Sequence, residues 1–93
     1  MKEGNRRRRE AIDDPELWKF FRPDGRLERM PASRALRRRL LERLASRFER
    51  DREYPESEVN VALSAVHNDF ASLRRALVDE AVLRRDHGSY RRA

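Results

Sequence analysis

The chain has 93 residues, which suits one small domain and excludes a second of ordinary size. Charged residues make up 43% of it and hydrophobic residues 38%, and 23 Lys and Arg against 17 Asp and Glu leave a net charge of +6. There is no cysteine, which excludes disulfides and thiolate metal sites. We find no apolar run of roughly 18 residues for a membrane span and no secretory leader. We therefore expect a cytoplasmic domain without a membrane partner.

Residues 1–13 are predicted to be a disordered basic tail, because they carry the run Arg6–Arg9 and show no hydrophobic periodicity. The rest, residues 14–93, is predicted to form a single domain. Association with RNA or ribosomes through Arg6–Arg9 would depend on this tail alone.

A short helix is predicted to begin at Asp14-Pro15-Glu16, with Asp able to cap it and Pro at its first position. The aromatic residues Trp18, Phe20 and Phe21 follow. They either complete the core or form an exposed patch that docks a partner. Burial is favoured because a domain this small needs all its apolar residues.

Arg22-Pro23-Asp24-Gly25 is a turn sequence, since Pro restricts one dihedral and Gly permits a positive φ. Residues 26–30 alternate between polar and apolar side chains, which predicts a short strand that ends at Pro31.

The strongest helix is predicted over residues 34–50, capped by Ser33. An apolar row at four-residue spacing predicts its core face: Leu36, Leu40, Leu44 and Phe48, widened by Leu41. A basic row runs beside it and consists of Arg39, Arg43, Arg47 and Arg50. This arginine ridge is either a solvated helix surface, the favoured interpretation, or a track for nucleic-acid phosphates.

Two further helices are predicted over residues 56–67 and 70–81, with Asn68 or Asp69 capping the second. The two or three residues between them fit the corner of a helix-turn-helix. The pattern then becomes extended, and residues 82–85 and 90–92 are predicted to form a β-hairpin whose turn needs Gly88.

This order of elements predicts a mainly α fold with a small β-hairpin (α+β), winged-helix-like. It has three core helices and a C-terminal wing, preceded by a short helix and strand. The exposed face of the third helix would present Ser72 and Arg75, which suit DNA contacts, beside Asp79 and Glu80, which phosphates repel. The wing is more basic, with Arg84, Arg85, Arg91 and Arg92. A basic wing supports salt-sensitive backbone binding rather than sequence recognition.

From Phe20 onward the sequence resembles the bacterial domain of unknown function DUF2087. The residues that carry the resemblance are Phe20, Asp24-Gly25-Arg26-Leu27, Pro31, Tyr54, Glu58-Val59-Asn60, His67, Asp69, Leu73-Arg74-Arg75, Leu77-Val78-Asp79, Arg85 and Tyr90-Arg91. Members of that family occur alone or behind an ArsR-type winged helix in transcriptional regulators, so the resemblance implies a link to transcription control. It supplies no catalytic residue. Where members have Thr or Ser three residues before Glu58, this chain has Pro55, which must start the helix through its own φ.

Candidate catalytic and metal sites are weak. His67 and Asp69, with Glu58 or His87, form a poor ligand set, and a structural role is favoured for both. Asn60 is expected to hydrogen-bond at the helix corner, and we expect Arg74 to pair with Glu58 or Asp79. We expect no enzyme, no metal and no cofactor.

Two functions remain open. The first is a transcription-associated regulatory domain that contacts the phosphate backbone of duplex DNA. The residues assigned to it are Arg39, Arg43, Arg47, Arg50, Ser72, Arg75, Arg84, Arg85, Arg91 and Arg92. The second is a protein-interaction or dimerisation module on the same scaffold, with a protein partner or a second copy and no DNA.

Overall fold

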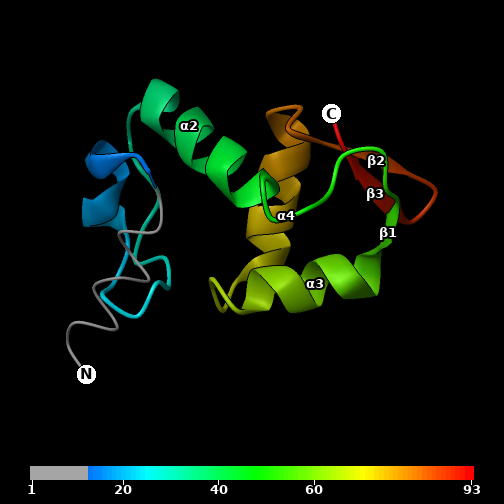
Figure 1. Cartoon of the computed structure of the whole chain (residues 1–93), viewed down its shortest axis with the longest axis horizontal. Coiled ribbons are helices and arrows are strands. Elements are labelled where there is room, and N and C mark those ends of the chain that lie inside the picture. The colour runs from blue at the N-terminus through cyan, green and yellow to red at the C-terminus, as the bar shows by residue number, and fades with distance from the viewer. Residues whose placement is uncertain (1–12) are drawn as a thin grey trace.

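The computed structural model describes residues 13–93, so all but the last residue of the predicted basic tail lies outside the described part. Over these residues the chain forms four helical segments and a small sheet (Figure 1). In order they are the 3₁₀ helix η1 (Pro15–Phe20), α2 (Arg34–Ala45), β1 (Tyr54–Pro55), α3 (Glu56–Ser64), α4 (Phe70–Asp79), β2 (Leu83–Asp86) and β3 (Ser89–Arg92).

The winged-helix-like prediction is confirmed: α2, α3 and α4 are followed by an antiparallel hairpin. The sheet also contains β1, for which the sequence carries no strand pattern. Its strand order is β1-β3-β2, with Tyr54 opposite Tyr90 and Pro55 opposite Ser89. A two-residue strand is too short to show alternation, and its proline is tolerated because β1 is an edge strand. Figure 1 shows the sheet at the end of the molecule farthest from η1.

The hairpin turn has the predicted chemistry. His87 and Gly88 link Asp86 to Ser89, and both have positive φ, 49° and 83°. Two central residues with positive φ form a type I′ turn, whose twist matches that of the strands on either side. Asp86 contacts His87 through its carboxylate, at 2.6 Å from Nδ1.

Helix α2 is shorter than predicted. Ser33 caps it as expected, since its hydroxyl accepts a hydrogen bond from the amide of Leu36, but the helix ends at Ala45 rather than at residue 50. The chain continues in tight turns, with the Phe48 amide bonded to the Ala45 carbonyl. Phe48 lies beyond the end of α2, but its side chain is still buried in the core. It therefore fits the four-residue apolar spacing without being helical, and for this reason the predicted helix was too long.

Helices α3 and α4 end at Ser64 and Asp79, earlier than predicted. Of the two predicted caps of α4, Asn68 and Asp69, the structure uses Asp69, whose carboxylate accepts a hydrogen bond from the Ser72 amide. The end of α4 is a Schellman motif: the amides of Ala81 and Val82 bond to the carbonyls of Val78 and Leu77, both at 2.9 Å. Ala81 adopts the left-handed conformation there, with φ 58°.

This left-handed alanine predicts a stabilising substitution. Ala81→Gly should raise the free energy of unfolding by about 1 kcal/mol, because glycine adopts positive φ without the steric cost that Cβ imposes. Urea denaturation of the two proteins would measure the difference. A decrease in stability would show that the Ala81 methyl contributes packing that outweighs its backbone strain.

The N-terminal segment belongs to the core. Leu17, Phe20, Phe21 and Leu27 are all buried among the helices, so Phe20 and Phe21 are core residues, while Trp18 is half-buried. The turn is confirmed, with Gly25 at φ 89°. The predicted strand over residues 26–30 is wrong: the structure has an isolated bridge between Phe21 and Leu27, because the chain there turns back on η1 and pairs at one position.

Arg26 ties this segment to the corner between α3 and α4. Its guanidinium donates to the carbonyls of Ser64 and Ala65, at 3.1 and 3.2 Å, and to the side chain of Asn68 at 2.6 Å. The amide of Leu27 bonds to the Val66 carbonyl at the same corner. The carbonyls left over at the end of α3 are therefore satisfied by a distant part of the chain.

A polar network joins α3, α4 and β3. Arg74 bonds to Asn60 and lies 3.8 Å from Glu56, whose carboxylate accepts a 2.7 Å hydrogen bond from the Tyr90 hydroxyl. This hydrogen bond lowers the pKa of Glu56, and burial raises the pKa of Tyr90. Asn60 has the structural role expected of it. The predicted partners of Arg74 are wrong, because Arg74 lies beside Glu56 whereas Glu58, also in the first turn of α3, pairs with Arg52.

Candidate nucleic-acid interface

The predicted arginine ridge on α2 is divided by the N-terminal segment. Arg39 makes a bidentate contact with Asp14, at 2.6 to 3.1 Å, and a 3.0 Å contact with Glu16. Asp14 is buried, and its side chain does not cap η1 as predicted. Its carboxylate accepts the hydrogen bonds of Arg39 instead. These hydrogen bonds raise the pKa of Arg39. Arg43 pairs with Asp13 at 3.1 Å. Half of the ridge is thus neutralised by carboxylates distant in sequence.

The other two ridge arginines lie outside the helix. Arg47 and Arg50 follow the end of α2 and are exposed. Within residues 13–93 neither makes a hydrogen bond or ion pair through its side chain. The single continuous ridge that the 34–50 helix predicted is therefore wrong, because the geometry of α2 places only Arg39 and Arg43 on one helical row.

Helix α4 exposes a face that is not basic. Its exposed side chains are Ser72, Arg75 and Asp79, and half-buried alanines and valine flank them. Arg75 has no hydrogen bond or ion pair in the described part of the chain, whereas Asp69 at the helix start has its pKa lowered by hydrogen bonds from Ser72. One arginine beside one carboxylate provides little with which to read base edges.

The wing arginines divide between the two faces of the hairpin. Arg84 lies directly opposite Arg91, and both are exposed. Arg85 lies opposite Tyr90, and Arg92 opposite Leu83, on the other face. Arg91 lies 3.8 Å from Glu53, while Arg84 has no ion pair or hydrogen bond among the described residues.

The Arg84–Arg91 pair is electrostatically unfavourable on its own. Like charges directly opposite each other in an antiparallel pair repel, since their Cβ atoms are only about 5 Å apart. The two arginines border a shallow hollow of about 270 Å³ on the sheet, which Ser89, Asp86 and Glu53 also line. An anion bound between the two guanidinium groups would relieve their repulsion.

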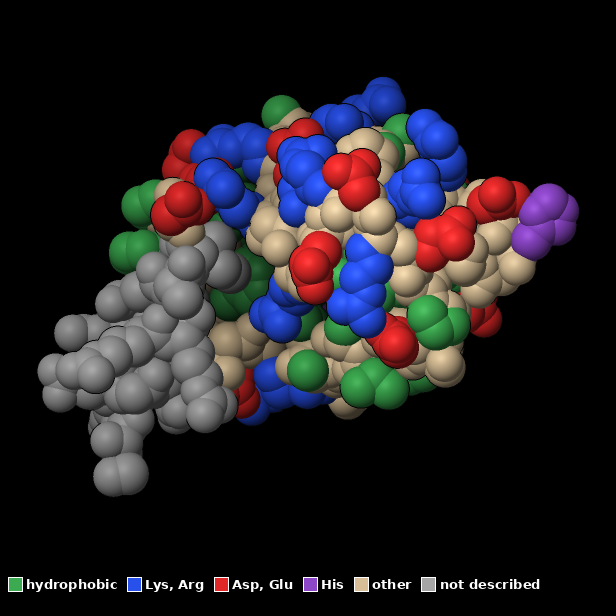
Figure 2. Space-filling model, turned by 45° about the vertical axis from the view of Figure 1, so that its right-hand side comes forward, with side chains coloured by type: hydrophobic (Ala, Val, Ile, Leu, Met, Phe, Trp, Pro, Cys, Tyr) green, Lys and Arg blue, Asp and Glu red, His purple; other side chains and the backbone are tan. Residues whose placement is uncertain are grey.

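The surface around these elements is basic but mixed. Figure 2 shows Lys and Arg side chains gathered along the upper part of this face, with Asp and Glu between them. Such a surface suits contacts at a few points rather than a continuous electrostatic track.

The structure gives no support for a metal centre: residues 13–93 contain no group of three His, Asp or Glu side chains that could hold an ion. His67 instead accepts a 2.9 Å hydrogen bond from the Asp69 amide through Nδ1. Among the helices described, none has the length and hydropathy of a membrane-spanning segment.

One further group of residues was not predicted. Arg38, on α2, faces Arg50 and Arg92 across a pocket between α2 and the end of β3. No sequence spacing relates these positions, since they come from three separate parts of the chain.

Comparison with known proteins places the chain in a protein family. Searches of curated proteins and of solved structures returned no match. A family model matches residues 26–92, from the arginine that ties the N-terminal segment to the helix corner to the last residue of β3. The matched family is described as an uncharacterised protein conserved in bacteria, and it is the one that the sequence resembled. The chain belongs to the DUF2087 family.

Proposed function

We propose that the domain binds the phosphate backbone of duplex DNA through the outer face of its wing, as a transcription-associated regulatory module. The observation that carries the proposal is the Arg84–Arg91 pair, two exposed guanidinium groups opposed across the hairpin. The proposal includes no catalytic step, no metal and no cofactor.

The fold supports this role because winged helices place the wing beside the DNA backbone and the third helix near the major groove. Arg75 on α4 adds another guanidinium that has no hydrogen bond or ion pair with the residues described. Asp79 lies on the same face of α4, and its negative charge repels phosphates from the C-terminal half of the helix. This distribution of charges favours contacts with the DNA phosphate backbone over contacts with the bases.

A salt titration tests the proposal. The logarithm of the association constant for a short duplex should fall linearly with the logarithm of the salt concentration. The expected slope is about −2 to −4, because each phosphate neutralised by an arginine contributes about −0.9. Duplexes of unrelated sequence should bind with similar affinity. Fluorescence anisotropy at a series of salt concentrations measures both, and absence of binding at low salt would refute the proposal.

A second candidate, a protein-interaction or dimerisation module, is favoured by a different surface. A mainly apolar groove of about 190 Å³ lies between Leu27, Met30 and the first two turns of α4. Val61 on α3 is 72% exposed, the only large hydrophobic side chain so exposed in residues 13–93. If the duplex fails to bind while light scattering shows a dimer, this candidate replaces the first.

A further inference from the structure

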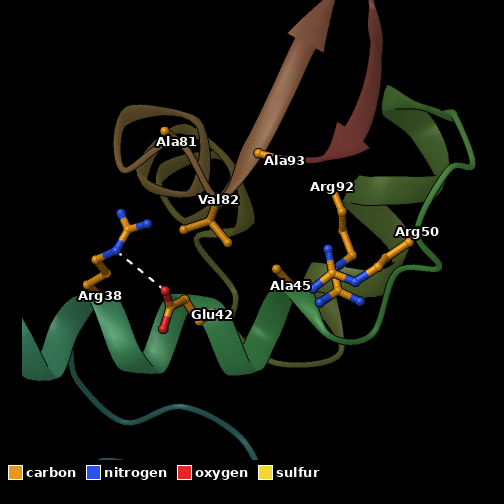
Figure 3. Close-up of a pocket in the computed structure, with 8 residues that line it drawn as sticks. All are labelled: Arg38, Glu42, Ala45, Arg50, Ala81, Val82, Arg92 and Ala93. Atoms are coloured by element: carbon orange, nitrogen blue, oxygen red, sulfur yellow. Dashed lines mark ion pairs between the residues drawn. The ribbon is translucent and has the colours of Figure 1, made fainter.

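The pocket of Figure 3 lies apart from the outer face of the wing. It has a volume of about 330 Å³ and is lined by Arg38, Glu42 and Ala45 of α2, Arg50, Ala81, Val82, and Arg92 and Ala93 at the end of β3. A volume of this size suits a small molecule. Arg92 and Arg91 are consecutive in β3, so they point to opposite faces of the strand, and the pocket is separate from the Arg84–Arg91 pair.

Two guanidinium groups meet in this pocket without a carboxylate between them. Figure 3 shows the Arg50 and Arg92 side chains pointing toward each other from the turn after α2 and from β3. Arg92 is half-buried and donates to the Phe48 carbonyl at 3.1 Å, which holds its guanidinium in place. Arg50 makes no hydrogen bond or ion pair within residues 13–93. Both side chains line the pocket.

The opposite wall is already paired. Arg38 contacts Glu42 at 3.4 Å, drawn as a dashed line in Figure 3, and Glu80 at 3.7 Å. Glu42 therefore does not neutralise Arg50 or Arg92. Between the two ends lie Ala45 and Val82, both buried and apolar. The pocket thus has one end with two guanidinium groups that make no ion pair within residues 13–93, an apolar floor, and a carboxylate at the other end.

We infer that this pocket binds a phosphate group, carried by a small phosphorylated molecule, with the phosphate at the Arg50–Arg92 end. Two guanidinium groups supply the charge and the paired N–H donors that a phosphate dianion accepts. The carboxylate of Glu42 can accept a hydrogen bond from a hydroxyl or amine elsewhere on the ligand. Because the lining residues come from α2, the α4–β2 link and β3, a bound ligand would tie α2 to the base of the wing.

Thermal denaturation and calorimetry with inorganic phosphate and with phosphoethanolamine test the inference. Binding only to the folded state raises Tm, by about 4 °C or more at saturating ligand for a domain of this size. Chloride at the same ionic strength should give a smaller rise. Phosphoethanolamine should bind more tightly than phosphate, because the carboxylate of Glu42 attracts its positively charged amine.

The matched variants are Arg50→Gln and Arg47→Gln. Both residues are exposed, lie in the turns after α2 and lack partners in the described chain, but only Arg50 lines the pocket. Arg50→Gln should weaken phosphate binding at least tenfold and leave the Tm of the free protein unchanged, whereas Arg47→Gln should change neither. Equal weakening by both variants, or equal Tm rises with phosphate and chloride, would overturn the inference.

A duplex-binding measurement on Arg50→Gln distinguishes the two sources of phosphate. Unchanged duplex affinity assigns the pocket to a small phosphorylated ligand. A loss of duplex affinity that parallels the loss of phosphate binding assigns it to the nucleic-acid backbone, and would overturn the small-molecule part of the inference. The result does not depend on Arg84, so it stands or fails separately from the proposed function.

Discussion

Leu17→Ala is expected to lower the free energy of unfolding by about 2–5 kcal/mol, enough to unfold a large fraction of a domain of this size. Leu17 is completely buried in η1 and lies outside the residues that the family model matches. The structure nevertheless places it in the same core cluster as α2 and α4. The expected loss has two parts, the apolar surface no longer removed from water and the cavity that remains.

Urea denaturation followed by circular dichroism measures this effect. Glu28→Ala in the same segment is the control, since Glu28 is exposed and its nearest ion-pair partner, Arg29, lies 3.8 Å away; it should change stability by less than about 0.5 kcal/mol. If Leu17→Ala is equally mild, the segment before residue 26 is an appendage and the domain folds without it.

Arg84→Glu is expected to separate DNA binding from folding. The substitution turns a repulsive cross-strand pair with Arg91 into an attractive one, so stability should rise by roughly 0.2–1 kcal/mol. Duplex affinity should fall at least tenfold, and the salt slope should become shallower by about one, because one phosphate contact is lost and a carboxylate is placed beside the backbone.

Arg34→Glu is the matched control, with the same change in net charge. Arg34 is the first residue of α2, is exposed and makes no ion pair with another described residue. Figure 1 shows the start of α2 at the opposite end of the molecule from the sheet. A glutamate there suits the positive end of the helix dipole, so the fold should tolerate it. If both variants lose duplex affinity equally, binding follows net charge and the wing has no special role.

The sequence predicted the local chemistry well. The caps at Ser33 and Asp69, the turn at Gly25 and the hairpin around Gly88 each depend on a few adjacent residues, and all four were confirmed. The order of helices and hairpin follows from these local signals, and therefore so does the winged-helix-like fold.

Features that depend on contacts between distant residues were not predictable. The end of α2 lacks a glycine or proline signal, and Phe48 continues the apolar spacing beyond it. The strand β1 is defined only by its pairing with β3. The arginine ridge failed for a similar reason. Helix α2 ends before Arg47, and Arg39 and Arg43 pair with Asp14, at the start of the predicted short helix, and with Asp13, in the predicted tail. Nor does any spacing relate Arg50 to Arg92.

The two-residue turn of the wing limits how far the hairpin can reach. Strands of four residues extend about 13 Å, at roughly 3.3 Å per residue, and the type I′ turn adds no loop beyond them. The major groove is itself about 12 Å wide. Under the proposed function, a wing of this length reaches across no more than one groove, so its arginines can contact only the phosphates that border that groove.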